Sequence, residues 1–116
     1  MRTADKALIA VYALIAVAAL IATWSNNLAF FAQPDNGGLA GFIRMSKANP
    51  AAASIAYDLT FLCIAAFIFM VGEARKLGIR FVWIYIVLSL CIAVSVMFPL
   101  FMIARQLKLA QARAAA

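Results

Sequence analysis

The chain has 116 residues, of which 68% are hydrophobic and 12% charged, and its net charge is +6. Soluble domains are about half apolar and a quarter charged, so this composition excludes an ordinary soluble domain. The sequence contains no histidine. This excludes His-ligated haem, His-ligated chlorophyll and the usual zinc sites from the chain's own residues.

The apolar residues gather in three blocks, at residues 7–24, 51–71 and 81–103. Each block is about 18 to 23 residues long, which is the length of helix that crosses about 30 Å of hydrocarbon. The first block is longer than the apolar core of a signal peptide, so we expect it to be a helix of the mature protein. The sequence therefore predicts an all-α integral membrane three-helix bundle. It forms one transmembrane domain over residues 1–116, with helices at about 5–24, 50–72 and 80–108.

Two connections join the predicted helices. Residues 33–38 are a strong turn signal, and Leu39, Phe42 and Ile43 beyond them share one helical face. This pattern favours an interfacial amphipathic segment in the lipid headgroup layer, with a loosely ordered loop as the alternative. The short connection after the second helix makes the second and third helices antiparallel neighbours. Three aromatic residues are the expected interfacial anchors: Trp24, Trp83 and Tyr85.

The ten basic residues flank the apolar blocks, which indicates contact with lipid headgroups rather than with nucleic acid. If the third block crosses the membrane, five basic residues lie on each side. One side then holds Arg2, Lys6, Arg75, Lys76 and Arg80, and the other holds Arg44, Lys47, Arg105, Lys108 and Arg113. With equal numbers of basic residues on the two sides, the positive-inside rule does not decide the orientation of the chain. A cytoplasmic N-terminus is favoured only because its side has the charges closest to the membrane.

The second block contains one carboxylate, Asp58. Asn49 and Pro50 are typical of a helix start, so Asp58 lies roughly two turns inside the helix, where a charge costs a few kcal/mol. Counting depth along antiparallel helices predicts an intramembrane polar cluster of Asp58, Ser95, Thr23, Thr60 and Pro99. Pro99 has no N–H and leaves the Ser95 carbonyl without its helical partner. Arg105 is the expected charge partner, reaching down from the helix end.

Three interpretations of Asp58 stay open. The carboxyl group pins the helices together through hydrogen bonds to Ser95 and Thr23, or it pairs with another subunit or a cofactor, or it forms a proton or cation site. Cys63 and Cys91 fall near the membrane midplane, where we expect free thiols that act as small hydrophobic side chains.

The sequence shows no catalytic constellation, so we expect a protein that is not an enzyme. The favoured function is an accessory or scaffold subunit packed against a larger membrane assembly, respiratory or photosynthetic in kind. The alternative is a small oligomeric transporter or ion- or proton-conducting protein that uses Asp58. Membrane lipids and other membrane subunits are the expected partners. No cofactor is expected from this chain alone, although contacts with lipid or pigment stay open.

Several motifs together resemble a family of small bacterial membrane proteins, domain of unknown function 2834. They are Ala48-Asn49-Pro50, Asp58-Leu59, the block from Glu73 to Tyr85, and Phe98-Pro99-Leu100-Phe101 followed by Arg105. The resemblance covers residues 6–105. It implies a multi-pass protein of three helices in the bacterial inner (cytoplasmic) membrane, and it brings no activity with it.

Overall fold

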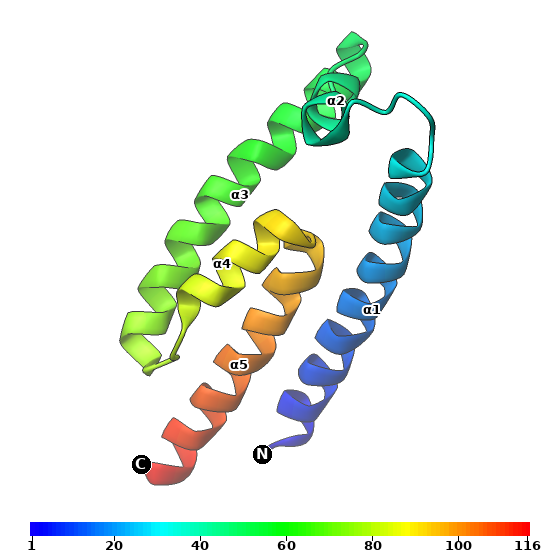
Figure 1. The fold of residues 1–116 in the computed structure, drawn as a ribbon. Helices are drawn as coiled ribbons and strands as arrows, with labels where there is room; N and C mark the ends of the chain where they lie inside the picture. The colour runs from blue at the N-terminus through cyan, green and yellow to red at the C-terminus, as the bar shows by residue number, and fades with distance from the viewer.

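The computed structural model describes all 116 residues as five helices without a strand, which confirms the all-α class (Figure 1). The helices are α1 (Thr3–Phe31), α2 (Gly38–Met45), α3 (Pro50–Leu77), α4 (Val82–Cys91) and α5 (Val94–Ala115). The molecule is elongated, with principal extents of 57 × 24 × 24 Å. The predicted three-helix bundle is not confirmed.

The two longest helices, α1 and α3, are long and apolar enough to cross a membrane. Both extend further than predicted. α1 continues past Trp24 because the side chains of Ser25 and Asn26 donate to the Ala22 carbonyl one turn back, so these polar residues fit within the helix. α3 continues through good helix formers to Leu77 and ends at Gly78, whose φ of 71° suits glycine.

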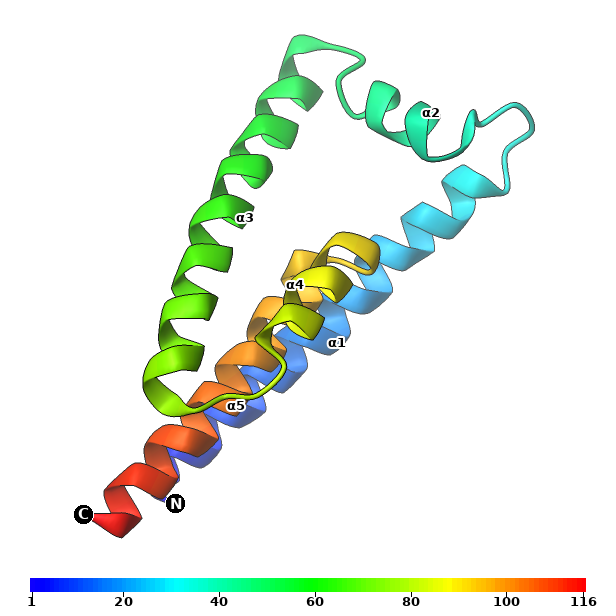
Figure 2. The same cartoon turned by 60° about the vertical axis from the view of Figure 1, so that its left-hand side comes forward.

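The helix starts and the short helix α2 follow from local sequence. The Asn49 side chain accepts a hydrogen bond from the Ala52 N–H at 2.8 Å, and Pro50 occupies the first position of α3. α2 is an ordered helix carrying Leu39, Phe42 and Ile43, so this segment is not a loose loop. It lies across the end of the molecule where α1 leads to α3 (Figure 2).

The predicted third helix is instead a hairpin of two helices. The chain reverses at Ile92 and Ala93, so α4 runs away from the end of α3 and α5 runs back (Figures 1 and 2). Both chain termini therefore lie at the same end of the molecule (Figure 1). This corrects the expectation of a third crossing that would carry the C-terminus to the opposite end.

No glycine or proline stands at the reversal, and Pro99 lies further on, inside α5. Tertiary contacts hold the turn instead. The Trp24 indole N–H donates to the Ile92 carbonyl at 2.9 Å, and the Ala93 carbonyl accepts from the N–H groups of Val96 and Met97. These bonds give partners to backbone groups that a break in a helix leaves free.

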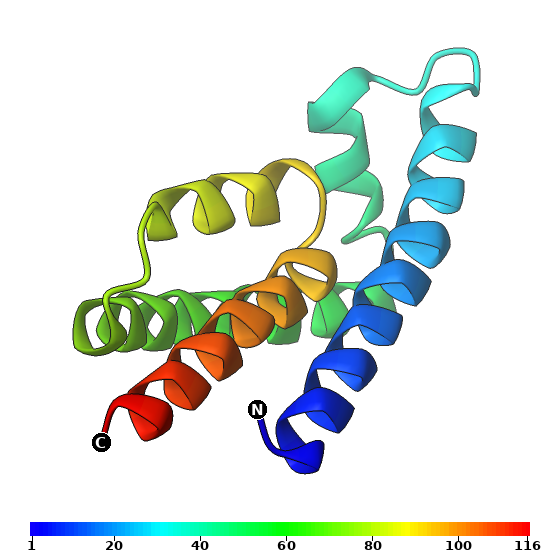
Figure 3. The same ribbon diagram turned by 90° about the horizontal axis from the view of Figure 1, so that it is seen from below.

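The core is small and lies where α3, α4 and α5 meet. It consists of Met70, Ala74, Ile79 and Phe101, with the Tyr85 ring edge-on to Phe101 at 5.5 Å. Tyr85, an expected interfacial anchor, thus packs against the core, whereas Trp83 is 60% exposed. α5 contacts α1, α3 and α4, and Figure 3 shows it running beside α1. Only 13 residues are buried, so most apolar side chains of α1 and α3 face outward.

We predict that Trp24→Phe destabilises the hairpin. The change keeps an aromatic ring but removes the N–H that pairs with the Ile92 carbonyl, and an acceptor left without a partner costs about 1 to 3 kcal/mol. Thermal unfolding in detergent micelles measures the loss. Trp83→Phe is the matched control and should change stability little, because no hydrogen bond holds the exposed Trp83. Equal effects of the two substitutions would contradict this role of Trp24.

Candidate functional site

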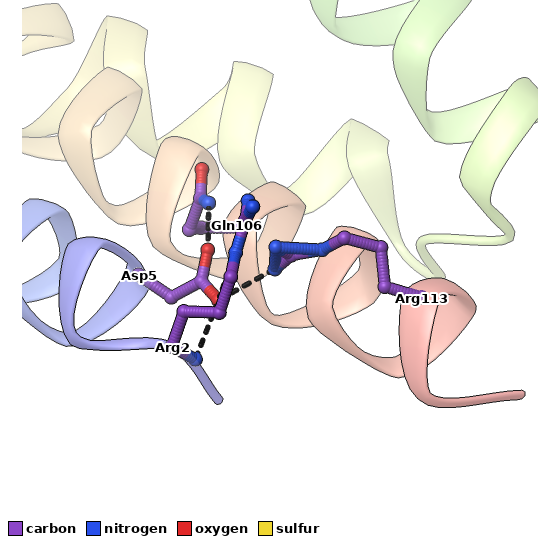
Figure 4. Close-up of polar contacts among 4 residues, drawn as sticks. All are labelled: Arg2, Asp5, Gln106 and Arg113. Atoms are coloured by element: carbon purple, nitrogen blue, oxygen red, sulfur yellow. Dashed lines mark hydrogen bonds and ion pairs between the residues drawn. The ribbon is translucent and has the colours of Figure 1, made fainter.

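A buried carboxylate joins the two ends of the chain. Asp5, in the first turn of α1, is 1% exposed. Its oxygens accept from the Arg2 backbone N–H at 3.0 Å, from Gln106 Nε2 at 2.6 Å and from Arg113 Nη2 at 2.5 Å (Figure 4). Gln106 and Arg113 are seven residues apart on α5 and therefore lie on one helical face. We call Arg2, Asp5, Gln106 and Arg113 the terminal clamp.

A second ion pair joins α5 to α3. Arg105 Nε donates to Glu73 Oε2 at 2.7 Å, and Lys76 Nζ lies 3.7 Å from the other oxygen of Glu73. The Arg105 guanidinium also lies over the Phe69 ring at 5.7 Å. Arg105 is therefore the partner of Glu73, which corrects its expected pairing with Asp58. Arg105 and the next residue, Gln106, tie α5 to α3 and to α1 respectively.

Both paired carboxylates lie outside the apolar blocks at residues 7–24 and 51–71. Burial alone would raise the pKa of Asp5. The hydrogen bonds from Gln106 and Arg2 and the nearby charges outweigh burial and hold this pKa below its usual range. The hydrogen bond from Arg105 is the main reason why the pKa of Glu73 is also lowered. Both groups are therefore ionised at neutral pH.

The return of α5 also gathers the positive charges. Eight of the ten basic residues belong to the end that holds both termini and the α3–α4 turn: Arg2, Lys6, Arg75, Lys76, Arg80, Arg105, Lys108 and Arg113. The other two, Arg44 and Lys47, lie in or beside α2. The equal division expected from three crossings is thus replaced by a strong asymmetry.

The predicted polar cluster around Asp58 is not joined by hydrogen bonds. Asp58 is exposed and takes part in none of the side-chain hydrogen bonds or ion pairs of the structure. Thr23 Oγ1 donates to the Ala19 carbonyl, and Thr60 Oγ1 donates to the Ala56 carbonyl, each at 2.8 Å within its own helix. The carboxylate therefore has no partner within this chain.

A cleft of about 440 Å³ lies between α1, α3 and α5. Two members of the predicted cluster, Ser95 and Pro99, line it from α5, and Ile15 lines it from α1. Its α3 wall consists of Leu59, Leu62, Ala65 and Ala66. Asp58 is one turn before Leu62 and two turns before Ala65, so it lies on the same face of α3. Ser95 therefore lines the cleft, whereas Asp58 is not one of its lining residues and lies next to Leu59 on the same face of α3.

The structure shows no cluster of side chains that could bind a metal ion. Cys63 and Cys91 are free cysteines, and no three Cys, Asp or Glu side chains lie together in a metal-binding arrangement.

Sequence reasoning missed the terminal clamp. With three complete crossings, α5 would end on the opposite side of the membrane from Asp5, so the sequence predicts no contact between Asp5 and residues 106–116. Two signals could have found it. Asp5 is three residues after Arg2 at a helix start, where a carboxylate caps free N–H groups, and Gln106 and Arg113 share a helical face.

We predict that Asp5→Asn separates the ends of α1 and α5. The amide cannot form an ion pair with Arg113 and offers only one acceptor atom to the three donors. The melting temperature in detergent should fall by several degrees, as about 1 kcal/mol does for a domain of this size. Asp35→Asn removes the same charge from an exposed loop and should change the melting temperature little. The clamp would be disproved if both variants melted like the parent.

Acid should weaken the same contact. Because folding lowers the pKa of Asp5, its ion pair contributes fully above the usual aspartate value of about 3.9 and is lost as the pH falls through the lower folded value. Unfolding scans between pH 7 and pH 2 should show a loss of stability at the acid end. This loss should be smaller in Asp5→Asn, and identical pH profiles would contradict the assignment.

Comparison with known proteins gives a family but no activity. Residues 11–107 match the family described as Protein of unknown function DUF2834. No curated protein and no solved structure matches the chain. The match covers most of the sequence, including α3, α4 and the cleft. The chain belongs to the DUF2834 family of proteins of unknown function.

Proposed function

We propose that this protein is a non-enzymatic, multi-pass membrane subunit. α1 and α3 cross the bilayer, and α4 and the first half of α5 enter it as a hairpin from the side of the termini. The exposed apolar surface carries this proposal. Only 6% of the most apolar stretch of α1 or α3 is buried, and Leu14, Ile55, Phe61 and Ile68 are each 70% exposed. Each Å² of such surface costs about 25 cal/mol in water, a cost that lipid removes.

The charge asymmetry orients the protein in this proposal. Basic residues near membrane spans are retained on the cytoplasmic side. The eight basic residues at the shared end of the termini therefore lie in the cytoplasm, and α2 with Arg44 and Lys47 lies on the other side. The membrane is the cytoplasmic membrane of a bacterium.

The accessory role follows from how little of the protein packs against itself. α5 contacts α1, α3 and α4, but α1 and α3 keep broad apolar faces that only lipid or other subunits can cover. In lipid, close packing and interhelical polar contacts drive helix association. A larger membrane assembly, respiratory or photosynthetic in kind, offers such packing to a small subunit without its own reactive centre.

We predict that both termini are cytoplasmic. Green fluorescent protein fused to either end of the full chain should fluoresce in bacterial cells, because this reporter folds only on the cytoplasmic side. An epitope inserted between Asp35 and Asn36 should be accessible to a protease only from the opposite side of the membrane. Fluorescence at the N-terminal fusion alone would instead support three complete crossings.

Purification in mild detergent tests the accessory role. The protein should elute with other membrane subunits in fixed proportion, and raising the detergent strength should release it as a folded chain. A single monodisperse monomer, obtained from native membranes at every detergent strength, would contradict the proposal.

A further inference from the structure

Asp58 is the one charged residue in the apolar block at residues 51–71. It lies two turns after Pro50 in an apolar helix, and no basic residue of the chain pairs with it. Arg105 is bound to Glu73, and Lys47 lies over the Tyr57 ring at 4.9 Å. Carboxylates within membrane helices are rare and have a partner, so the partner of Asp58 comes from outside the chain.

The cleft beside Asp58 indicates the size of that partner. Its volume of about 440 Å³ falls within the range of pockets that hold small organic molecules. Seven of its nine lining residues are hydrophobic, and Ser95 contributes the only hydroxyl. Asp58 is not one of these nine residues, but it is next to Leu59 on the face of α3 that supplies Leu62 and Ala65. A molecule that fills the cleft and extends past Leu59 therefore approaches the carboxylate.

We propose that this cleft binds a small lipophilic cation. The apolar body of the molecule packs between α3 and α5 against Leu62, Phe98 and Pro99, and its positive group pairs with Asp58. This inference goes beyond the proposed accessory role, since the cleft lies within one chain and needs no other subunit.

Charge complementarity favours this occupant over two others. A second copy of the chain would bring only Arg44 and Lys47 to this end of α3, and Lys47 already lies over the Tyr57 ring of its own chain. A phospholipid with an amine headgroup would bring a phosphate together with its amine, and a lone carboxylate repels that phosphate. An organic cation satisfies both the charge and the apolar walls.

Tetraphenylphosphonium is the probe that tests the proposal, and tetraphenylborate is its control, with the same shape and the opposite charge. Equilibrium dialysis with the full chain in a nonionic detergent should show saturable binding of the cation at one site per chain and none of the anion. Asp58→Asn should weaken binding by about tenfold or more, as losing a charge-assisted contact does. Asp58→Glu should retain binding.

Three further arms separate the proposal from its competitors. Asp35→Asn removes an exposed carboxylate remote from the cleft and should leave binding unchanged. Ala65→Phe fills the cleft from an exposed position and should reduce binding while the circular dichroism spectrum stays that of the parent. Bilayer discs of phosphatidylglycerol with and without phosphatidylethanolamine should bind the cation equally.

The proposal is overturned if Asp58→Asn binds the cation as tightly as the parent, if the anion binds equally well, or if no saturable binding occurs. It is also overturned if phosphatidylethanolamine displaces the cation, because a lipid amine is then the occupant. None of these results depends on co-purification with other subunits, so this site and the accessory role can fail separately.

Discussion

The buried carboxylate of Asp5 is the contact on which the arrangement of the chain depends. A charge removed from water must be compensated by opposite charge and hydrogen bonds, and α5 supplies both through Arg113 and Gln106. α5 can supply them only by running back alongside α1. The return of α5 in turn requires the reversal at Ile92 and Ala93, which places the two termini and eight basic residues at one end of the molecule.

The hairpin also depends on a contact at its other end. In the proposed membrane placement the reversal lies within the bilayer, where backbone that is not helical is tolerated only if other protein groups satisfy it. The Trp24 indole meets this condition at the Ile92 carbonyl. Between the two ends, α5 is held to α3 by Arg105 and Glu73. Contacts at three levels therefore position α5, although the core itself contains only four buried residues.

Much of the fold could be predicted because it depends on local signals. Apolar length predicts α1 and α3, Asn49 and Pro50 predict the start of α3, and the spacing of Leu39, Phe42 and Ile43 predicts α2. The hairpin could not be predicted in this way. An apolar run of about 23 residues has the same hydropathy whether it crosses a bilayer or turns within it. No residue at the reversal marks a turn, and the contact that holds it joins positions far apart in sequence.

The candidate site was predicted only in part, because its contacts also join positions that are far apart in the sequence. Asp58 stands out as an acid in an apolar helix, and the cleft does include Ser95 and Pro99. The expected hydrogen bonds from Asp58 to Ser95 and Thr23 are absent, and Thr23 donates instead to the Ala19 carbonyl of its own helix. Arg105 pairs with Glu73 and not with Asp58, because the chain reverses at Ile92 and Ala93 and α5 carries Arg105 back to the level of Glu73.

The distance between the two ends of the chain tests the central claim most directly. Spin labels at Lys6 and Gln111, both exposed, can be introduced into full-length protein whose two cysteines are replaced by alanine. Pulsed electron resonance in bilayers should give a narrow distribution well below the hydrocarbon thickness of about 30 Å, because the terminal clamp holds α1 beside α5. A distance at or above that thickness would place the labels on opposite sides of the membrane and contradict the account.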